Sequence, residues 1–160
     1  MKAIQVGDMI PCFSLPDQYG NIVNIMNFIG KKKIVIFFYP RDGSYGCTAE
    51  ACYFRDLSQT FEEVHAVVLG ISGQSVESHK KFSEQYHLDY PILCDEGNRI
   101  RKLFGGPSMI FGLIPGRATY IANTEGKIVY IFNSLSQPER HVDEALRICL
   151  LLKKTSDGNE

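Results

Sequence analysis

An almost wholly apolar run, KIVIFFY at residues 33–39, is the feature that most limits how this chain can fold. A β-branched and aromatic run of this length is typical of a strand that is covered on both faces. Pro40 ends the run, and a second run, AVVLGI, follows at residues 66–71. Between them, residues 48–63 carry apolar side chains at roughly helical spacing: Cys52, Phe54, Leu57 and Phe61. Strand, helix and strand in this order predict a right-handed parallel crossover.

The following segments continue this alternation. Residues 75–88 predict a polar helix that Ser75 can cap, and an extended segment follows at residues 90–93. The runs at residues 119–122 and 127–132 flank a four-residue turn and predict an antiparallel hairpin. We therefore expect an α/β domain with a thioredoxin-like fold, in which a mixed central sheet has helices on both faces.

The last part of the chain predicts a helix that opens at Pro138 and has one apolar face. The polar residues 155–160 after it predict a disordered tail. A chain of 160 residues can bury one continuous core, so we expect a single domain over residues 1–154.

Charge and cysteine content narrow the possible partners and location. The chain has 17 Lys and Arg against 18 Asp and Glu, with both signs scattered along its length, which argues against nucleic acid or a membrane as a partner. Residues 1–12 contain no apolar stretch long enough for a secretory signal, so we expect a cytoplasmic protein. Five cysteines, an odd number, favour reduced and partly reactive thiols over a structural disulfide framework.

Cys47 follows Gly46 directly and is expected in the first turn of the helix after KIVIFFY. The unpaired backbone N–H groups and the positive end of the helix dipole stabilise a thiolate at that place. A nearby arginine would strengthen this effect. Cys47 is therefore a candidate nucleophile, and the alternative is a small buried hydrophobic residue.

Cys52 lies five residues further along the same predicted helix. On an intact helix, Cα atoms five residues apart are roughly 8.5 Å from each other, whereas a disulfide needs its Cα atoms within about 7 Å. The two cysteines can therefore be joined only if the first turns unwind, unlike the cysteines of a C-x-x-C motif. Because Cys52 also falls on the apolar face, a role in packing remains the alternative.

The segment FFYPRDGSYGCTAEACYFRD resembles the active-site segment of peroxiredoxins of the bacterioferritin-comigratory-protein type, also called the peroxiredoxin Q group. The resemblance extends over nearly the whole chain. VGDMIPCFSLPDQYGNIVNI is similar to the opening of the family, GRATYIANTEGKIVYIF to its G-x-x-R-x-T block, and HVDEAL to its closing helix.

The resemblance implies a thiol peroxidase that reduces hydrogen peroxide and organic hydroperoxides. Cys47 would be the peroxidatic residue that becomes a sulfenic acid, and Cys52 would resolve it as an intramolecular disulfide. Thioredoxin or a glutaredoxin would then reduce that disulfide by thiol exchange. The resemblance also implies a monomer, and we expect no cofactor and no metal.

Four further residues occupy positions that are functional in the family. Pro40 would shield the thiolate, the Ser44 hydroxyl would bond the thiolate or the peroxide, and Arg117 would stabilise the charge that develops on the peroxide oxygens. Glu50 would pair with Arg117 and orient it. Tyr45 departs from the family, which commonly has Pro there, and would place an aromatic ring at the mouth of the pocket.

The remaining cysteines and histidines are expected to be unreactive. We interpret Cys12, Cys94 and Cys149 as packing residues, with Cys94 the best alternative resolving thiol because it ends a strand. Three histidines are expected at surface or loop positions and a fourth on the last helix, in no zinc-site spacing: His65, His79, His87 and His141.

Two other functions remain possible for a thioredoxin-like chain. A thiol–disulfide oxidoreductase is disfavoured because C-x-x-C is absent. A non-catalytic interaction module would require Cys47 to be merely structural.

Overall fold

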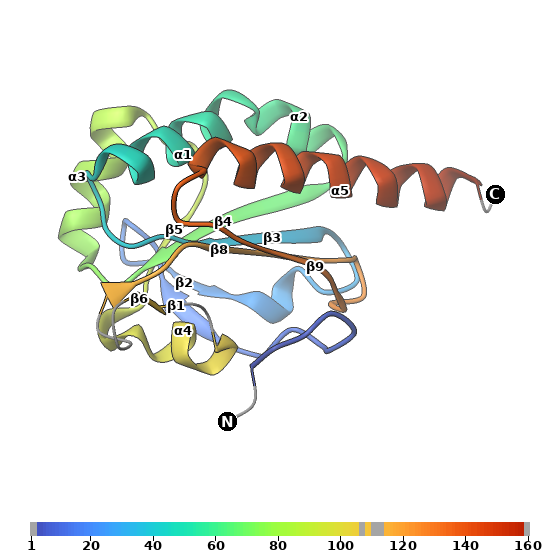
Figure 1. Ribbon diagram of the computed structural model, residues 1–160, viewed down its shortest axis with the longest axis horizontal. Helices are drawn as coiled ribbons and strands as arrows, with labels where there is room; N and C mark the ends of the chain where they lie inside the picture. Colours follow the sequence, from blue (N-terminus) through green and yellow to red (C-terminus); the bar gives the residue numbers. More distant parts are fainter. Residues whose placement is uncertain (1–2, 106–107, 110–113, 159–160) are drawn as a thin grey trace.

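The computed structural model describes residues 3–105, 108–109 and 114–158 (Figure 1). Its strands are β1 (Ser14–Pro16), β2 (Ile22–Asn24), β3 (Lys33–Phe38), β4 (Ala66–Ser72), β5 (Ile92–Cys94), β6 (Ser108–Met109), β7 (Ile114–Pro115), β8 (Ala118–Ala122) and β9 (Ile128–Asn133). Its α-helices are α1 (Tyr45–Asp56), α2 (Ser58–Glu63), α3 (Val76–Tyr86), α4 (Arg99–Phe104) and α5 (Pro138–Gly158). Two short 3-10 helices are η1 (Ile25–Asn27) and η2 (Glu96–Asn98).

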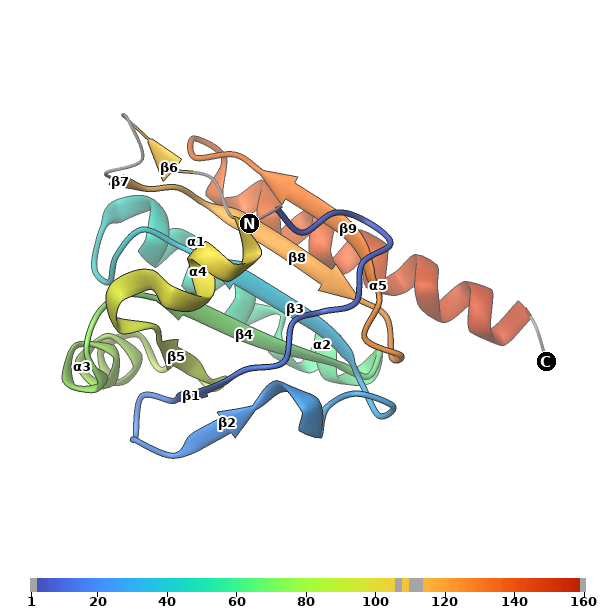
Figure 2. The ribbon, with the colours of Figure 1, turned by 90° about the horizontal axis from the view of Figure 1, so that it is seen from below.

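Five strands form the central sheet in the order β5-β4-β3-β8-β9 (Figure 2). β3 pairs in parallel with β4, and β4 with β5, whereas β3 with β8 and β8 with β9 are antiparallel. The predicted parallel crossover and the predicted hairpin are therefore both confirmed. Within the part of the chain that the structure describes, β1 with β2 and β6 with β7 form two further small antiparallel sheets.

Every residue of β3 is buried because the central sheet is covered on both faces. Val35 and Phe37 point into a core with α1, α2, α3 and α5, whereas Ile34 and Ile36 point into a second core with α4 and the β1–β2 hairpin. The layers are visible in Figure 1, with α1, α2 and α5 above the sheet and α4, β1 and β2 below it. The continuous apolar run predicted this two-sided burial correctly.

The expected helix over residues 48–63 is two helices in the structure. The backbone leaves helical geometry at Leu57, with φ −101° and ψ 11°, which separates α1 from α2. Phe54 of α1 and Phe61 of α2 nevertheless pack on each other, with ring centroids 5.7 Å apart. Apolar spacing alone missed the break because the same face stays buried on both sides of it.

The starts of α3 and α5 agree with the predicted ones, whereas the end of α5 differs. Ser75 caps α3 as predicted, because its hydroxyl accepts a hydrogen bond from the backbone N–H of Ser78. α5 begins at Pro138, packs against α1 and projects beyond the sheet (Figure 1). The helix continues through residues 155–158 of the expected disordered tail, whereas residues 159–160 lie outside the described residues.

Candidate active site

Cys47 is the third residue of α1, where the loop after β3 turns into the helix. The backbone N–H of Thr48 donates to the carbonyl of Ser44, so the helix begins just before the thiol. The side chain of Cys47 is fully buried against the core on the α1 face of the sheet. Its position in the first turn, predicted from the Gly-Cys pair, is confirmed.

Arg117 reaches the thiol from the segment before β8. Its Nη2 donates to Cys47 Sγ over 3.5 Å, and its side chain is only 4% exposed. Gly46 permits this approach, because a Cβ there would meet Arg117 Nη2 at 3.0 Å. A guanidinium held this close and away from water stabilises negative charge on sulfur or on a peroxide oxygen.

Glu50 anchors the other end of the same guanidinium. Arg117 Nη1 donates to Glu50 Oε1 over 2.6 Å, and the Glu50 side chain is fully buried. Burial raises the pKa of Glu50 to about 8, even though the charge of Arg117 and its hydrogen bond act to lower it. The second oxygen, Oε2, is buried without a hydrogen-bond partner. In the neutral carboxyl, this oxygen is the one that carries the proton.

His141 lies next to Glu50 and is hydrogen-bonded to Thr119. His141 Nε2 donates to the carbonyl of Ser134 at 2.7 Å, which leaves Nδ1 to accept from the Thr119 hydroxyl at 2.8 Å. Burial lowers the pKa of His141 to about 4, and the charge of Arg117 acts in the same direction. The ring is therefore neutral at pH 7 and lies 3.8 Å from Glu50 Oε2. The sequence predicted that His141 lies on the last helix but did not predict its contact with Glu50.

Arg101 of α4 is a second buried guanidinium that the sequence reasoning missed. Its Nη2 donates to the carbonyl of Tyr39 at 3.0 Å, and its Nη1 donates to the carbonyl of Gly116 at 2.9 Å. These carbonyls immediately precede Pro40 and Arg117, so one side chain joins the two segments that carry active-site residues. No periodicity marks such a residue, because its function depends on two distant backbone groups.

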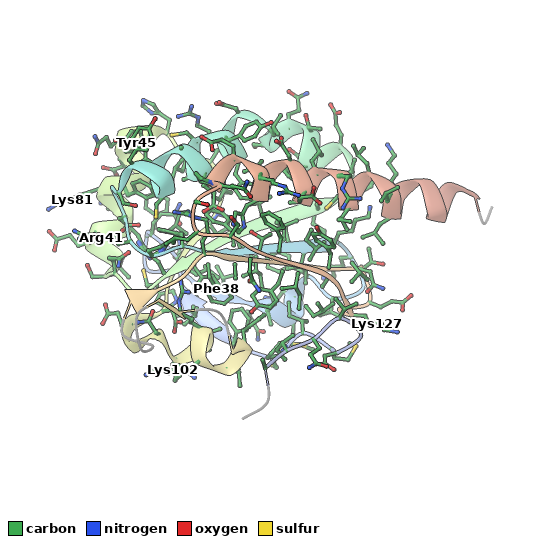
Figure 3. The ribbon with its side chains drawn as sticks, viewed as in Figure 1. Phe38, Arg41, Tyr45, Lys81, Lys102 and Lys127 are labelled. Atoms are coloured by element: carbon green, nitrogen blue, oxygen red, sulfur yellow. The ribbon has the colours of Figure 1, made fainter. Side chains whose placement is uncertain are left out.

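Ser44, Pro40 and Tyr45 lie around the start of α1. The Ser44 hydroxyl donates to the carbonyl of Arg41 over 3.4 Å, and Pro40 is half-buried. The Tyr45 side chain is 93% exposed and projects outward on the side of the molecule where α1 begins (Figure 3). Its ring therefore points to solvent and does not cover the thiol.

Cys52 is half-buried on α1, away from Arg117. Arg55 Nη1 donates to its sulfur over 3.6 Å and to the carbonyl of Tyr86 over 2.6 Å. Burial raises the pKa of Cys52 in spite of the charge of Arg55. Because both cysteines lie on one unbroken helix, the predicted separation of their Cα atoms applies to the folded state.

The other cysteines divide into buried and exposed residues. Cys94 and Cys149 are buried, and burial raises the pKa of each to about 12, as suits packing residues. Cys12 is exposed, so the prediction that it packs is wrong. It lies outside the regular strands, where no apolar periodicity indicates which way a side chain points.

The histidine predictions were right for His65 and His87, which are exposed, and wrong for His79, which is fully buried. His79 lies on α3, where its polar neighbours in sequence suggested a solvated position. Among the described residues, no group of three or more His, Cys, Asp or Glu side chains is arranged to hold a metal ion. The described helices also include none that is long and apolar enough to cross a membrane.

Comparison with known proteins places this site in a family. Residues 6–131 match the model of the AhpC/TSA family. The chain belongs to this family. Over 147 residues it is 46% identical to chloroplastic peroxiredoxin Q from Sedum lineare, covering 92% of this chain and 78% of the relative. The corresponding Arabidopsis thaliana protein is 44% identical over 144 residues, covering 90% of this chain and 66% of the relative.

A solved structure confirms the thioredoxin-like fold of the peroxiredoxins. Peroxidoxin BcpB from Mycobacterium tuberculosis superimposes with a TM-score of 0.85 at 34% identity, covering 92% of this chain and 97% of that one. The chain is thus a thiol-dependent peroxidase, an oxidoreductase of the peroxiredoxin type. Proteins of this type act on hydroperoxides with a thioredoxin-type reductant.

The comparison contradicts the predicted cytoplasmic location. The curated relatives named above are chloroplastic proteins. The prediction was wrong because it rested on the absence of a secretory pattern in residues 1–12, and such an absence does not identify a compartment.

Proposed function

We propose that Cys47 is the peroxidatic residue and that it reduces hydrogen peroxide and organic hydroperoxides. The thiolate attacks the terminal oxygen of ROOH, the O–O bond breaks, and Cys47 becomes a sulfenic acid. The alkoxide that leaves takes up a proton and departs as ROH, or as water when the substrate is hydrogen peroxide. The observation that carries the proposal is the buried contact between Arg117 and the Cys47 sulfur at the start of α1.

Arg117 and Glu50 act together in this proposal. Arg117 Nη2 faces the sulfur, where negative charge leaves the thiolate and develops on the peroxide oxygens. Glu50 Oε1 holds Nη1 and thereby sets the orientation of the guanidinium. A fixed donor of this kind needs no reorganisation when the O–O bond breaks.

Pro40 and Ser44 complete the proposed peroxide site. Pro40 limits access of water to the thiolate, and the Ser44 hydroxyl donates a hydrogen bond to the thiolate or the bound peroxide. In the present conformation this hydroxyl faces the carbonyl of Arg41 at the long distance of 3.4 Å. A weak bond of this length is easily exchanged for one to a charged ligand, since charge-assisted hydrogen bonds are about twice as strong.

Cys52 is the proposed resolving residue. Its thiol attacks the sulfur of the Cys47 sulfenic acid, which forms an intramolecular disulfide and releases water. The geometry of α1 requires the first helical turns to unwind before these sulfurs meet. Cys94 is the weaker candidate, because it is buried at the end of β5 and its pKa is raised to about 12.

We further propose that thioredoxin or a glutaredoxin reduces this disulfide, and that residues 1–154 act as one monomeric domain. The unwound helix would expose the disulfide to the thiolate of the reductant, whereas the folded helix buries Cys47. Both cores of the domain include residues from β3 and from the β8–β9 hairpin, which supports a single folding unit.

The test of this function is non-reducing peptide mapping after one equivalent of hydrogen peroxide. We expect one Cys47–Cys52 linkage in the parent protein. Cys52→Ser should still consume peroxide and should accumulate Cys47 sulfenic acid, which a dimedone-type reagent traps. Cys47→Ser should abolish peroxide consumption.

Two matched cysteine variants complete the experiment. Cys12→Ser removes the exposed thiol and should leave both the peroxide reaction and the linkage unchanged. Cys94→Ser should also leave the linkage in place. A Cys47–Cys94 linkage would show that the resolving residue was assigned wrongly, and unreacted Cys47 would overturn the peroxidase assignment of this residue.

A further inference from the structure

A buried ion pair lies beneath the loop that joins β3 to α1, and the proposed chemistry does not use it. His79 Nδ1 lies 2.6 Å from Asp42 Oδ2, with the His79 side chain fully buried and the Asp42 side chain 7% exposed. The hydroxyls of Ser78 and Tyr39 also donate to the Asp42 carboxylate, at 2.8 and 2.6 Å. Two side chains of α3 and one from the start of the same loop thus converge on Asp42.

Both ring nitrogens of His79 contact oxygen atoms of other residues. Its second ring nitrogen, Nε2, lies 3.1 Å from the carbonyl of Leu93. Both ring nitrogens therefore face oxygen acceptors, and only the protonated ring donates from both. Burial by itself raises the pKa of Asp42, but the contact with His79 and the hydrogen bonds from Tyr39 and Ser78 together hold that pKa below its usual value. Asp42 is therefore a carboxylate at neutral pH.

A second contact fixes the same loop to the segment before α3. Gln74 Oε1 accepts from the backbone N–H of Asp42 at 3.0 Å, and Gln74 Nε2 faces the carbonyl of Pro40 at 3.5 Å. The loop is thus attached to α3 and to β5 through groups that lie outside α1. Figure 3 shows Arg41 of the loop and Lys81 of α3 projecting outward on the same edge of the molecule.

We propose that the Asp42–His79 ion pair is a positioning device that holds the peroxide-binding loop in place independently of α1. The loop carries Pro40 and Ser44 and leads directly into Cys47, so its place sets the geometry of the attack on the peroxide. The opening of α1 that lets Cys52 reach Cys47 breaks no bond to Asp42. The pair therefore serves peroxide reduction and is not needed for disulfide formation.

This inference rests on the proposed function, because it separates the two steps assigned to Cys47 and Cys52. The variant His79→Gln keeps a hydrogen-bond donor near Asp42 and removes the imidazole ring that can pair with it as a cation. The rate of Cys47 oxidation is measured by competition with a haem peroxidase for limiting hydrogen peroxide. The rate of disulfide formation is measured separately, by acid quenching, alkylation and peptide mapping.

We expect His79→Gln to slow Cys47 oxidation about tenfold, because a displaced loop no longer presents the peroxide in line with the thiolate. Disulfide formation should be at least as fast as in the parent protein. Under excess peroxide, the variant should therefore accumulate less Cys47 sulfinic acid. An unchanged oxidation rate would overturn the inference, as would a proportional loss in both steps together with a lower melting temperature.

Two more variants keep the test decisive if the buried substitution prevents folding. Ser78→Ala removes one half-buried donor to Asp42 and should slow oxidation alone, by about threefold. Lys81→Gln removes an exposed ion pair with Glu77 on the same helix and should change neither step. If the parent protein forms no Cys47–Cys52 linkage, the proposed resolving step fails. The effect on oxidation still decides whether the ion pair positions the loop.

Discussion

The two thiols of α1 each have a guanidinium at nearly the same distance, yet their surroundings differ. Arg117 lies 3.5 Å from Cys47 Sγ, and Arg55 lies 3.6 Å from Cys52 Sγ. Arg117 comes from a distant part of the chain, is 4% exposed and is anchored by the buried Glu50. Arg55 comes from the same helix turn as Cys52, is 31% exposed and pairs with an exposed carboxylate, Asp56.

This difference indicates that distance to a positive charge does not decide which thiol reacts with peroxide. Water screens the charge of a partly exposed guanidinium, so the interaction of Arg55 with sulfur is weak. A buried and anchored guanidinium keeps its full electrostatic effect on a charge that develops nearby. This contrast supports the proposal that Cys47 carries out the peroxide chemistry and that Cys52 reacts only after the helix opens.

The largest expected effect comes from Arg117→Met. Loss of the buried donor should lower kcat/KM for hydrogen peroxide by a factor of about 100 to 1,000, as for other donors to developing negative charge. Arg117→Lys keeps the charge without the paired geometry and should retain part of the activity. Steady-state peroxidase assays measure both variants. A loss of less than about fivefold in Arg117→Met would contradict the inference that the buried guanidinium of Arg117 acts more strongly than the exposed one of Arg55.

Gly46→Ala tests the approach of Arg117 without touching its charge. The added Cβ would meet Nη2 at 3.0 Å, so the guanidinium has to move by a few tenths of an ångström. We expect kcat/KM to fall about tenfold. Thermal stability should not fall in parallel, because Ala is the better helix former in the first turn of α1. Comparing kcat/KM with the melting temperature separates the two effects.

Glu50 should make the stability of the fold depend on pH. In the folded protein its pKa is raised to about 8, and in the unfolded chain it is about 4.3. Between these values the folded state binds the proton more strongly, so stability falls as the pH rises. The lowered pKa of His141, about 4, has the opposite effect, but only up to the ordinary histidine value of about 6.5.

The window between pH 6.5 and 8 therefore isolates Glu50. In the Cys47→Ser protein, which lacks the Cys47 thiol, the free energy of unfolding should fall by on the order of 1 to 2 kcal/mol across this window. Adding Glu50→Gln should flatten this dependence. Urea titrations at several pH values measure it, and equal slopes with and without Glu50 would contradict the assignment of a protonated carboxyl.

The smallest effect is expected from Arg55→Met. Peroxide oxidation of Cys47 should be unchanged, and disulfide formation should stay within about twofold of the parent rate, because the lost interaction is solvent-screened. Rapid quenching and peptide mapping measure the second step. A tenfold change in that step would show that Arg55 activates Cys52. The partly exposed arginine would then affect its thiol much as the buried Arg117 affects Cys47.

Much of the fold was predictable because local sequence patterns, such as apolar runs and helix-capping residues, determine it. The run at residues 33–39 predicted a two-sided central strand, and Ser75 predicted the start of α3. The break at Leu57 was not predictable from spacing, because the apolar face continues through it. The exposure of Cys12 was missed for a related reason, since periodicity informs only on residues inside regular elements.

The candidate site was predictable where a residue type has one role in a local motif or in the family resemblance. Cys47, Cys52, Arg117 and Glu50 were named in this way, and the contact of Glu50 with Arg117 agrees with its predicted partner. His79, His141 and Arg101 were not identified. A buried histidine or arginine has no signature in the sequence when its partners are distant carbonyls, hydroxyls or carboxylates.

The sequence by itself determined the strand before Cys47, the position of this thiol at a helix start, and its spacing from Cys52. These properties follow from backbone geometry within one or two elements, where distances depend only on residue number. Only the tertiary structure decided that Arg117, 70 positions away in the chain, meets the sulfur beside Gly46, and that His79 lies buried beneath the active-site loop. Such contacts depend on how whole elements pack, because burial removes the water that would otherwise screen charges and satisfy polar groups.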